Sequence, residues 1–255
     1  MSGDWFEDDS FWAAYAPLMF DEERWAEVPA VVDALERLVG LEAGAAVLDS
    51  CCGPGRHSIE FAARGYRVTG VDITETYLEA ARESAAGLEL PLEFCRADIR
   101  SFVRPGSFDL AINLYTSFGY FPSPEEDLAA LRNIRRSLRP GGALVLETNG
   151  KETAARDFID GETFERSGWT VRTEYEVVGP WEGLRNRWIL SRENPLSPAG
   201  PRETVDRSFV LRLYSATELR AALLAAGFSD VELYGNLGAS PYDQHASSLV
   251  ALARS

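Results

Sequence analysis

The chain has 255 residues, of which 40 are acidic and 25 basic, and a formal net charge of −15. This length allows one large domain with a substantial core. The acidic balance argues against nucleic acid as a partner, because such binding depends on cations that neutralise phosphates. Anionic membranes would also repel the chain, no apolar run approaches about 18 residues, and no signal peptide precedes Trp5, so we expect a cytoplasmic protein without a membrane partner.

A short apolar run at residues 45–48 is typical of a buried parallel strand, and it ends at Asp49. Gly53 and Gly55 follow in a turn where the absence of a Cβ atom lets a ligand approach the backbone closely. Apolar residues at helical spacing over 59–63 then predict a helix. Because the first N–H groups of a helix have no intrahelical partner, this turn favours an anionic or polar group of a ligand.

The next strand, at residues 67–71, ends at Asp72, whose carboxylate can accept hydrogen bonds from two ribose hydroxyls. A dinucleotide-binding fold places an acid in this way about 20 residues after its glycine turn. That fold has the fingerprint G-x-G-x-x-G, whereas residues 53–55 (GPG) are here followed by 56–58 (RHS), without a third glycine. A nicotinamide oxidoreductase is therefore an alternative that the glycine spacing disfavours.

Strands and helices continue to alternate along the chain. Thr74 can cap a helix, and a strand at 92–97 is followed by Asp98 and Ile99. Further strands are predicted at 108–114, 143–148, 231–234 and 247–253, and further helices at 125–138 and 216–226. This alternation predicts a parallel sheet with helices on both faces.

The first strand and its glycine turn resemble those of the class I S-adenosylmethionine-dependent methyltransferases. The matching residues are Asp49, Cys51, Gly53 and Gly55, with Cys51 at a position where the family usually has glycine. The resemblance implies a Rossmann-like α/β fold with a seven-stranded, mostly parallel sheet and an antiparallel last strand. It also implies S-adenosyl-L-methionine as cofactor. The pattern looks closest to small-molecule methyltransferases such as amino-sugar N,N-dimethyltransferases, which share an SFGY-like stretch after strand four and a β-rich insertion before the last helix.

Within that family, the acid at the position of Asp98 meets the adenine amino group, and its apolar neighbour, here Ile99, packs on the ring. Tyr15 and Arg24, from an aromatic-rich N-terminal stretch, could reach the amino-acid end of the cofactor. The residues that we therefore expect at the cofactor are Tyr15, Arg24, Asp49, Cys51, Cys52, Gly53, Gly55, Asp72, Ile73, Asp98, Ile99, Asn113 and Leu114.

The chain divides into three predicted parts. Residues 1–42 are expected to form an N-terminal helical cap, residues 43–149 and 215–255 the cofactor-binding core, and residues 150–214 a β-rich inserted lid. Within the lid, strands are predicted at 170–178, 187–192 and 207–213, with a short helix before them and a proline-rich loop at 194–201. Because ligands of open α/β sheets lie beyond the carboxyl ends of the strands, the insertion should start at the rim of the site, as a lid or as the contact of a homodimer.

Three segments should face the transferred methyl group. One is the aromatic N-terminal stretch, which includes Phe6 and Trp12, and the other two hold the candidate catalytic residues. Tyr115 begins the aromatic stretch after the fourth strand, and Tyr242 and His245 lie in the connection between the last two strands. Positioning can lower the barrier by about 7–11 kcal/mol, more than the roughly 3–5 kcal/mol that a general base supplies. The three cysteines do not suggest a disulfide framework, and no Cys/His cluster has zinc spacing.

The predicted function is methyl transfer from S-adenosylmethionine to a small molecule by in-line displacement, with nitrogen, oxygen and carbon acceptors all open. The alternative is a protein that binds the cofactor without transferring the methyl group, because Cys51 departs from the family pattern and no base is obvious.

Overall fold

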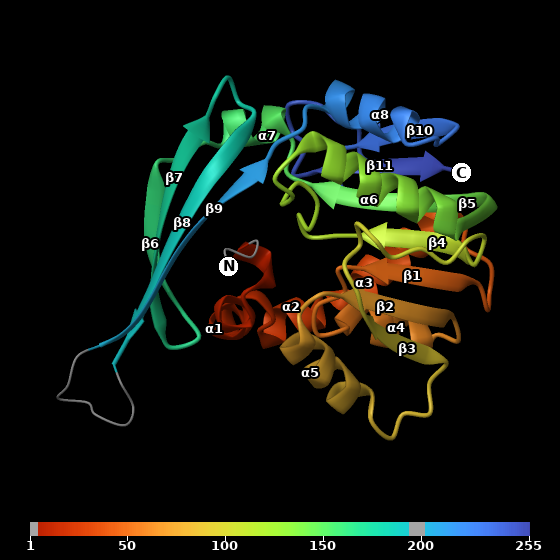
Figure 1. Ribbon diagram of the computed structural model, residues 1–255, viewed down its shortest axis with the longest axis horizontal. Helices are drawn as coiled ribbons and strands as arrows, with labels where there is room; N and C mark the ends of the chain where they lie inside the picture. The colour runs from red at the N-terminus through yellow and green to blue at the C-terminus, as the bar shows by residue number, and fades with distance from the viewer. Residues whose placement is uncertain (1–4, 194–201) are drawn as a thin grey trace.

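The computed structural model describes residues 5–193 and 202–255, so the predicted proline-rich loop at 194–201 lies outside the described residues. The central sheet has the strand order β10-β11-β5-β4-β1-β2-β3, and β11 runs antiparallel to both of its neighbours (Figure 1). Its strands are β1 (Ala46–Ser50), β2 (Arg67–Asp72), β3 (Leu92–Arg96), β4 (Phe108–Asn113), β5 (Leu138–Thr148), β10 (Asp230–Tyr234) and β11 (Leu249–Arg254). The predicted Rossmann-like, seven-stranded, mostly parallel sheet with an antiparallel last strand is confirmed.

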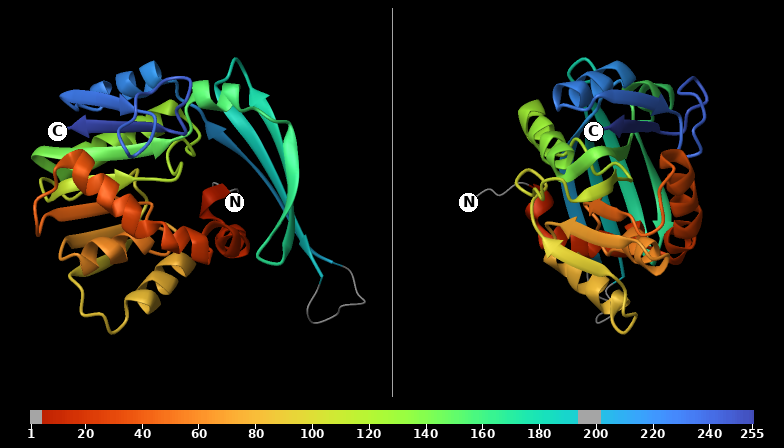
Figure 2. Two further views of the ribbon diagram at one scale, coloured as in Figure 1. Left: turned by 180° about the vertical axis from the view of Figure 1, so that it is seen from behind. Right: turned by 90° about the vertical axis from the view of Figure 1, so that its right-hand side faces the viewer.

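Helices cover both faces of the central sheet, as predicted (Figures 1 and 2). The helices are α3 (Val28–Val39), α4 (Arg56–Ala63), α5 (Glu75–Ala85), α6 (Pro124–Ser137) and α8 (Ala216–Ala225). Successive residues of a strand point to opposite faces. In β1, Val47 therefore packs in the core with Phe61 of α4, whereas Leu48 packs in the other core with Leu131 of α6 and Leu219 of α8. No helix in the described part of the chain is long and apolar enough to cross a membrane.

Strand β5 begins five residues before the predicted start at 143. Leu138 already pairs with Phe108, and the register shifts before Ala143 pairs with Leu110. Gly141, at φ +80°, adopts the left-handed backbone that this irregular stretch requires. The arginine and glycines that suggest a loop in the sequence thus form an extension of the strand. An ion pair between Arg139 and Asp109, at 2.6 Å, joins this extension to β4.

A separate antiparallel sheet of four strands, in the order β6-β7-β8-β9, follows β5 and the short helix α7 (Lys151–Arg156). Its strands are β6 (Gly161–Arg166), β7 (Trp169–Val178), β8 (Gly183–Arg192) and β9 (Glu203–Arg212). Sequence reasoning predicted three of them and missed β6, an edge strand of mostly exposed residues whose charged side chains hide any strand pattern. On the face turned to solvent, cross-strand ion pairs join Arg187 to Glu174 and to Asp206.

The N-terminal residues 5–27, which we call the N-terminal arm, lie between the two sheets (Figures 1 and 2). They form a 3₁₀ turn η1 (Trp5–Glu7) and helices α1 (Asp9–Met19) and α2 (Glu22–Ala26). Helix α1 buries Phe11, Tyr15 and Leu18, spaced on one face, against Trp169, Val171 and Leu190 of the second sheet. The arm also reaches the core, where the hydroxyl of Tyr77 donates a hydrogen bond of 2.9 Å to the carbonyl of Trp12.

Candidate functional site

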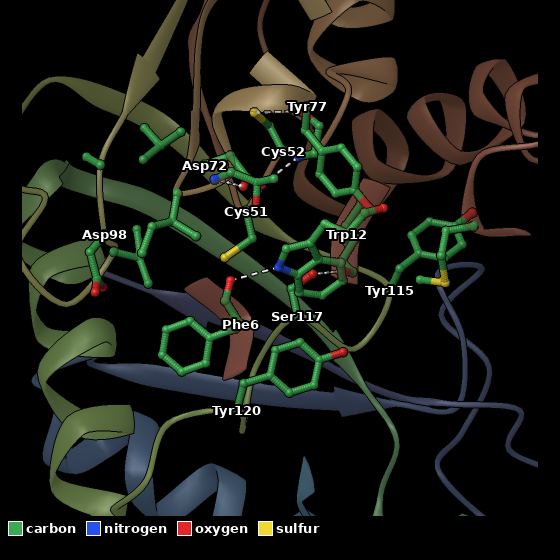
Figure 3. A pocket seen from close by; sticks show the side chains of 18 of the residues that line it. Phe6, Trp12, Cys51, Cys52, Asp72, Tyr77, Asp98, Tyr115, Ser117 and Tyr120 are labelled. Carbon is green, nitrogen blue, oxygen red and sulfur yellow. Dashed lines mark hydrogen bonds between the residues drawn. The ribbon is translucent and has the colours of Figure 1, made fainter. Parts of the chain in front are cut away.

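A cavity opens at the carboxyl ends of β1, β2, β3 and β4, where the central sheet and the N-terminal arm meet (Figure 3). Residues of the glycine turn, the acids that end β2 and follow β3, and aromatic side chains of the arm and of the loop after β4 surround it. Its lining residues are Phe6, Trp12, Met19, Phe20, Cys51, Cys52, Gly53, Arg56, His57, Val71, Asp72, Ile73, Thr74, Tyr77, Ala97, Asp98, Ile99, Leu114, Tyr115, Ser117, Tyr120 and Phe121.

The glycine turn has a backbone that few side chains tolerate. Cys51, Gly53 and Gly55 have φ values of +61°, +54° and +76°, all in the left-handed region. Cys51 therefore adopts the left-handed backbone that suits the glycine usual at this position in the family. Its Cβ atom makes this conformation sterically unfavourable. At Gly55, an added Cβ would lie 2.6 Å from the ring of Phe94, so only glycine lets β3 approach the turn this closely.

The carboxylate of Asp72 is held by the turn that it faces. Its two oxygens accept hydrogen bonds from the backbone N–H groups of Gly53, at 2.8 Å, and of Thr74, at 2.9 Å. An ionised carboxylate offers about four acceptor positions, so two remain for hydroxyl groups of a ligand in the cavity. Burial raises the pKa of Asp72 above its usual value, against the lowering effect of these backbone hydrogen bonds.

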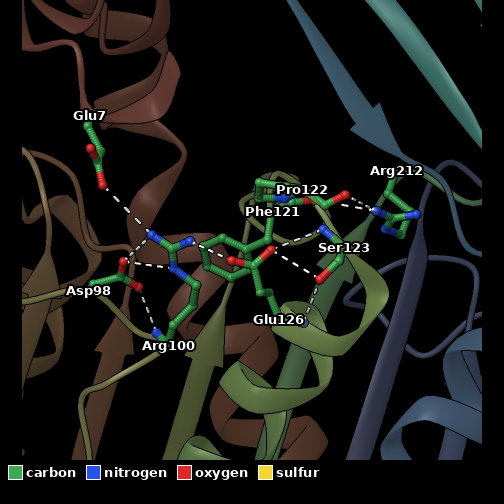
Figure 4. Close-up of polar contacts among 8 residues, drawn as sticks. All are labelled: Glu7, Asp98, Arg100, Phe121, Pro122, Ser123, Glu126 and Arg212. Carbon is green, nitrogen blue, oxygen red and sulfur yellow. Dashed lines mark hydrogen bonds and ion pairs between the residues drawn. The ribbon is translucent and has the colours of Figure 1, made fainter. Parts of the chain in front are cut away.

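The carboxylate of Asp98 is almost fully occupied by one arginine (Figure 4). One oxygen accepts the backbone N–H of Arg100 at 2.7 Å, and the other accepts two guanidinium N–H groups of the same residue at 2.8 and 2.6 Å. About one acceptor position is left on the first oxygen. That position suits a single donor such as an amino group, and the buried side chain of Ile99 beside it offers an apolar contact.

Asp49 does not line the cavity but lies beneath the turn. It is 3% exposed, and its carboxylate accepts a 2.6 Å hydrogen bond from the hydroxyl of Ser58 in α4. Burial raises its pKa to about 6. The acid therefore connects β1 to the first turn of the helix instead of offering a free oxygen to a ligand.

We expect Asp49→Asn to remove a pH dependence of stability. Because the pKa of Asp49 is about 6 in the folded protein and near 3.8 when unfolded, the folded state holds more protons between these values, and its stability falls as pH rises through this window. Relative to the wild type, the free energy of unfolding of the variant should grow by about 3 kcal/mol between roughly pH 4 and pH 7. Urea denaturation across this range measures the difference, and a pH-independent difference would contradict the burial argument.

A buried cation and two aromatic rings form the cavity wall next to α2. The guanidinium of Arg56 is 4% exposed, lies 4.1 Å from the ring centroid of Tyr115 and donates to the carbonyl of Arg24 at 2.6 Å. His57 stacks on the same tyrosine at 5.5 Å. Its burial lowers the pKa of the imidazole to about 3, so this histidine is neutral at ordinary pH.

The structure brings eight of the predicted cofactor residues and one predicted catalytic residue, Tyr115, to the cavity wall, and it places the others elsewhere. Asp49, Gly55 and Asn113 support the turn from behind, and the amide of Asn113 donates to Ser50. Tyr15 does not reach the cavity, because α1 turns it toward the second sheet with Phe11 and Leu18. Arg24 pairs with Glu27 at 3.1 Å and lies 5.6 Å from the ring of Tyr115, outside the cavity lining.

Tyr242 and His245 also lie away from the cavity. Their connection is at the expected end of the sheet, but β10 and β11 are its outermost strands on that side. With neighbouring strands about 4.8 Å apart, two or three intervening strands separate the connection from β1. The hydroxyl of Tyr242 donates to Glu152 of α7 at 3.0 Å, and the exposed ring of His245 contacts Gln244.

The sequence predicted that the aromatic N-terminal stretch, with Phe6 and Trp12, would cover the site, but it missed Met19 and Phe20, which also line the cavity. Trp12 and Met19 lie on the side of α1 next to the buried face, seven residues apart, and Phe6 and Phe20 flank the helix. The spacing of 12 and 19 was the available signal, since positions seven apart share a helix face. Arg56 was equally visible as the first residue of the helix after the turn, but its burial follows only from the position of the arm.

Comparison with known proteins agrees with this architecture. Residues 47–142 match the family model described as "Methyltransferase domain". A putative methyltransferase, YqeM of Bacillus subtilis (strain 168), is 29% identical over 115 residues, which are 45% of this chain and 46% of that protein, so the match spans less than half of its length. Residues 47–142 therefore match a methyltransferase domain, in agreement with the resemblance of the sequence to the S-adenosylmethionine-dependent methyltransferases.

Two further likenesses extend over more of the chain. The dTDP-3-amino-3,4,6-trideoxy-alpha-D-glucopyranose N,N-dimethyltransferase of Streptomyces venezuelae is 28% identical over 182 residues, 71% of this chain and 74% of that protein. The crystal structure of an S-adenosylmethionine-dependent methyltransferase from Clostridium acetobutylicum ATCC 824 superposes with a TM-score of 0.77 at 13% identity, covering 96% of this chain and 98% of that one. The expected likeness to amino-sugar N,N-dimethyltransferases is thus confirmed, and the second comparison shows the shared fold.

Proposed function

We propose that this protein transfers the methyl group of S-adenosylmethionine to a small-molecule acceptor. The observation that carries the proposal is the pair of acids at the carboxyl ends of neighbouring strands, each with hydrogen-bonding capacity to spare. Asp72 has about two acceptor positions left and Asp98 about one, which matches the two hydroxyls of a ribose and the amino group of an adenine.

The other walls suit the remaining parts of this cofactor. Ile73 and Ile99 offer apolar surface for a purine, and the glycine turn lets a ligand approach its backbone. Arg56, a buried cation at the cavity wall, is better placed than Arg24 to meet a carboxylate, because Arg24 already pairs with Glu27. When bound, S-adenosylmethionine supplies a methyl carbon that is already activated, since its leaving group is a neutral thioether.

Positioning and exclusion of water are the main tasks left to the chain. Phe6 and Trp12 of the arm close the cavity on one side, and the indole N–H of Trp12 donates to the carbonyl of Phe6 at 2.7 Å, which fixes their relation. Burial raises the pKa of Tyr115 and of Tyr120, so both phenols stay protonated and act as hydrogen-bonding groups instead of bases. Burial lowers the pKa of His57 to about 3, so its imidazole is a weak base at ordinary pH.

The arrangement favours in-line displacement in a closed site, with residues 150–214 acting as the lid and residues 1–42 as the cap over a core of residues 43–149 and 215–255. Positioning of this kind can supply about 7–11 kcal/mol of barrier reduction. The Streptomyces relative is named for a dTDP-amino sugar, and the proposal for this chain covers nitrogen, oxygen and carbon acceptors of small molecules.

Calorimetric titration tests the cofactor half of the proposal. We expect one molecule of S-adenosylmethionine or S-adenosylhomocysteine to bind per chain, and 5′-methylthioadenosine, which lacks the amino-acid end, to bind more weakly because it cannot reach Arg56. Transfer of labelled methyl from S-adenosylmethionine to a panel of amines, phenols and activated carbon acids tests the other half. Failure of both adenosyl amino acids to bind would refute the proposal.

A further inference from the structure

A second hollow adjoins the cavity along β9, and we call it the β9 groove. The turn η1, the loop after β4, the turn between β7 and β8, and β9 itself enclose it. Its aromatic lining consists of Trp5, Phe6, Tyr120, Phe121 and Phe209. Three of these, Phe6, Tyr120 and Phe121, also line the cavity, so the two hollows share a wall. A molecule in the groove would therefore touch the same side chains as a ligand of the cavity.

One charged side chain of the groove, that of Arg212, already has an ion-pair partner. The Nε of Arg212 lies 3.0 Å from a carboxylate oxygen of Asp127, which is 1% exposed. Its Nη2 donates to the carbonyl of Pro122 at 3.0 Å (Figure 4). The positive charge of Arg212 is thus balanced by a buried acid. Removing it from that acid to serve a ligand would leave a buried, uncompensated carboxylate.

The other charged side chain of the groove is available. Glu182 is exposed in the turn between β7 and β8, and its carboxylate has no ion pair and no side-chain hydrogen bond with any residue of the described ranges 5–193 and 202–255. The two stretches beyond those ranges, 1–4 (MSGD) and 194–201 (NPLSPAGP), contain neither lysine nor arginine. The groove therefore has a net negative character and no spare cationic side chain.

The charges and aromatic rings of the groove determine which class of ligand it can bind. A nucleoside diphosphate would bring at least two negative charges into a groove whose one lining cation is committed to Asp127. An ammonium group, in contrast, would gain a carboxylate partner at Glu182 and aromatic faces nearby. Two of the shared rings already lie against a cation, since the guanidinium carbon of Arg100 is 5.2 Å from the centroid of Phe6 and 4.8 Å from that of Phe121.

We propose that the β9 groove binds the methyl acceptor, and that this acceptor is a phosphate-free molecule with an apolar or aromatic body and a cationic amine anchored at Glu182. The inference rests on the proposed function, because it takes the adjoining cavity as the cofactor site. The amine at Glu182 is an anchor, and the atom that receives the methyl group lies at the other end of the acceptor, near the shared wall at Tyr120. The acceptor class thus differs from the nucleotide-linked sugar of the Streptomyces relative.

The test uses the full chain saturated with S-adenosylhomocysteine and follows binding by calorimetry and by tryptophan fluorescence. The probes are phenylalkylamines with one to four methylene groups, the matching phenylalkanols and dTDP. We expect the best amine to bind about tenfold more tightly than its alcohol, as a charge-assisted contact at a partly exposed site would give, and dTDP to show no saturable binding. Glu182→Gln should lower the affinity for the amine to that for the alcohol. Glu176→Gln, on the solvent face of β7, should leave the affinity for the amine unchanged.

The outcomes separate the two proposals. If S-adenosylhomocysteine does not bind, the proposed function fails before the groove is tested. If it binds but no amine exceeds its alcohol, if Glu182→Gln changes nothing, or if dTDP binds more tightly than every amine, the assignment of the acceptor class is overturned while the cofactor site stands.

Discussion

Asp72→Asn should lower the affinity for S-adenosylhomocysteine by about 30- to 1,000-fold, which corresponds to the loss of roughly 2–4 kcal/mol when two charge-assisted hydrogen bonds become neutral or are lost. The two carboxylate oxygens of Asp72 both accept backbone N–H groups, from Gly53 and Thr74. An asparagine amide would have to present its NH₂ group to one of these donors, so the glycine turn would be disturbed as well. Calorimetric titration measures the affinity.

The matched control for this variant is Asp206→Asn. Asp206 pairs with Arg187 on the solvent face of the second sheet, away from the cavity. Its replacement should leave the affinity for S-adenosylhomocysteine within about twofold of the wild type, as expected for a surface ion pair of small energetic weight. Equal affinities of the wild type and Asp72→Asn would remove Asp72 from the ribose contact.

Phe11→Ala should destabilise the protein by about 3–5 kcal/mol, the usual range for truncating a buried phenylalanine. Phe11 is 2% exposed, stacks on Tyr15 at 4.2 Å and contacts the rings of Trp5 and Trp12. Because Trp12 lines the cavity, the loss of this packing should also weaken the binding of S-adenosylhomocysteine. Urea denaturation with and without the ligand measures both effects.

Phe158→Ala is the control, because it removes an aromatic ring that is not buried. Phe158 is 36% exposed and contacts one ring, that of Trp181. We expect a change in stability below about 1 kcal/mol and no change in ligand affinity. A Phe11→Ala variant as stable as this control would show that the arm is not anchored through Phe11.

The central sheet could be predicted from the sequence because its signals are local. The glycine turn, the acids that end strands and the alternation of short apolar runs with helical spacing each lie within about ten residues, and this is the range over which periodicity indicates secondary structure. The same locality placed Asp72, Asp98 and Tyr115 at the carboxyl ends of strands, where the cavity is found.

The misplaced residues depended on distances across the fold. Tyr242 and His245 are at the correct end of their strands, but the sequence does not reveal that β10 and β11 form the far side of the sheet. Tyr15 was assigned to the cofactor because it is aromatic and near the start of the chain, whereas the orientation of α1 is decided by the second sheet. The homodimer through residues 150–214 stays a prediction.

The stacking of Trp5 on Phe209, with ring centroids 4.3 Å apart, has a consequence for the order in which the chain can assemble. The two residues are about 200 positions apart in the sequence, so their contact closes one of the longest loops that this chain allows. The arm is translated before its aromatic partners in β9, which follow it by about 200 residues. Until β9 is made, Trp5 lacks this partner, and the strands of the central sheet up to β5 are complete before the arm can dock on the second sheet.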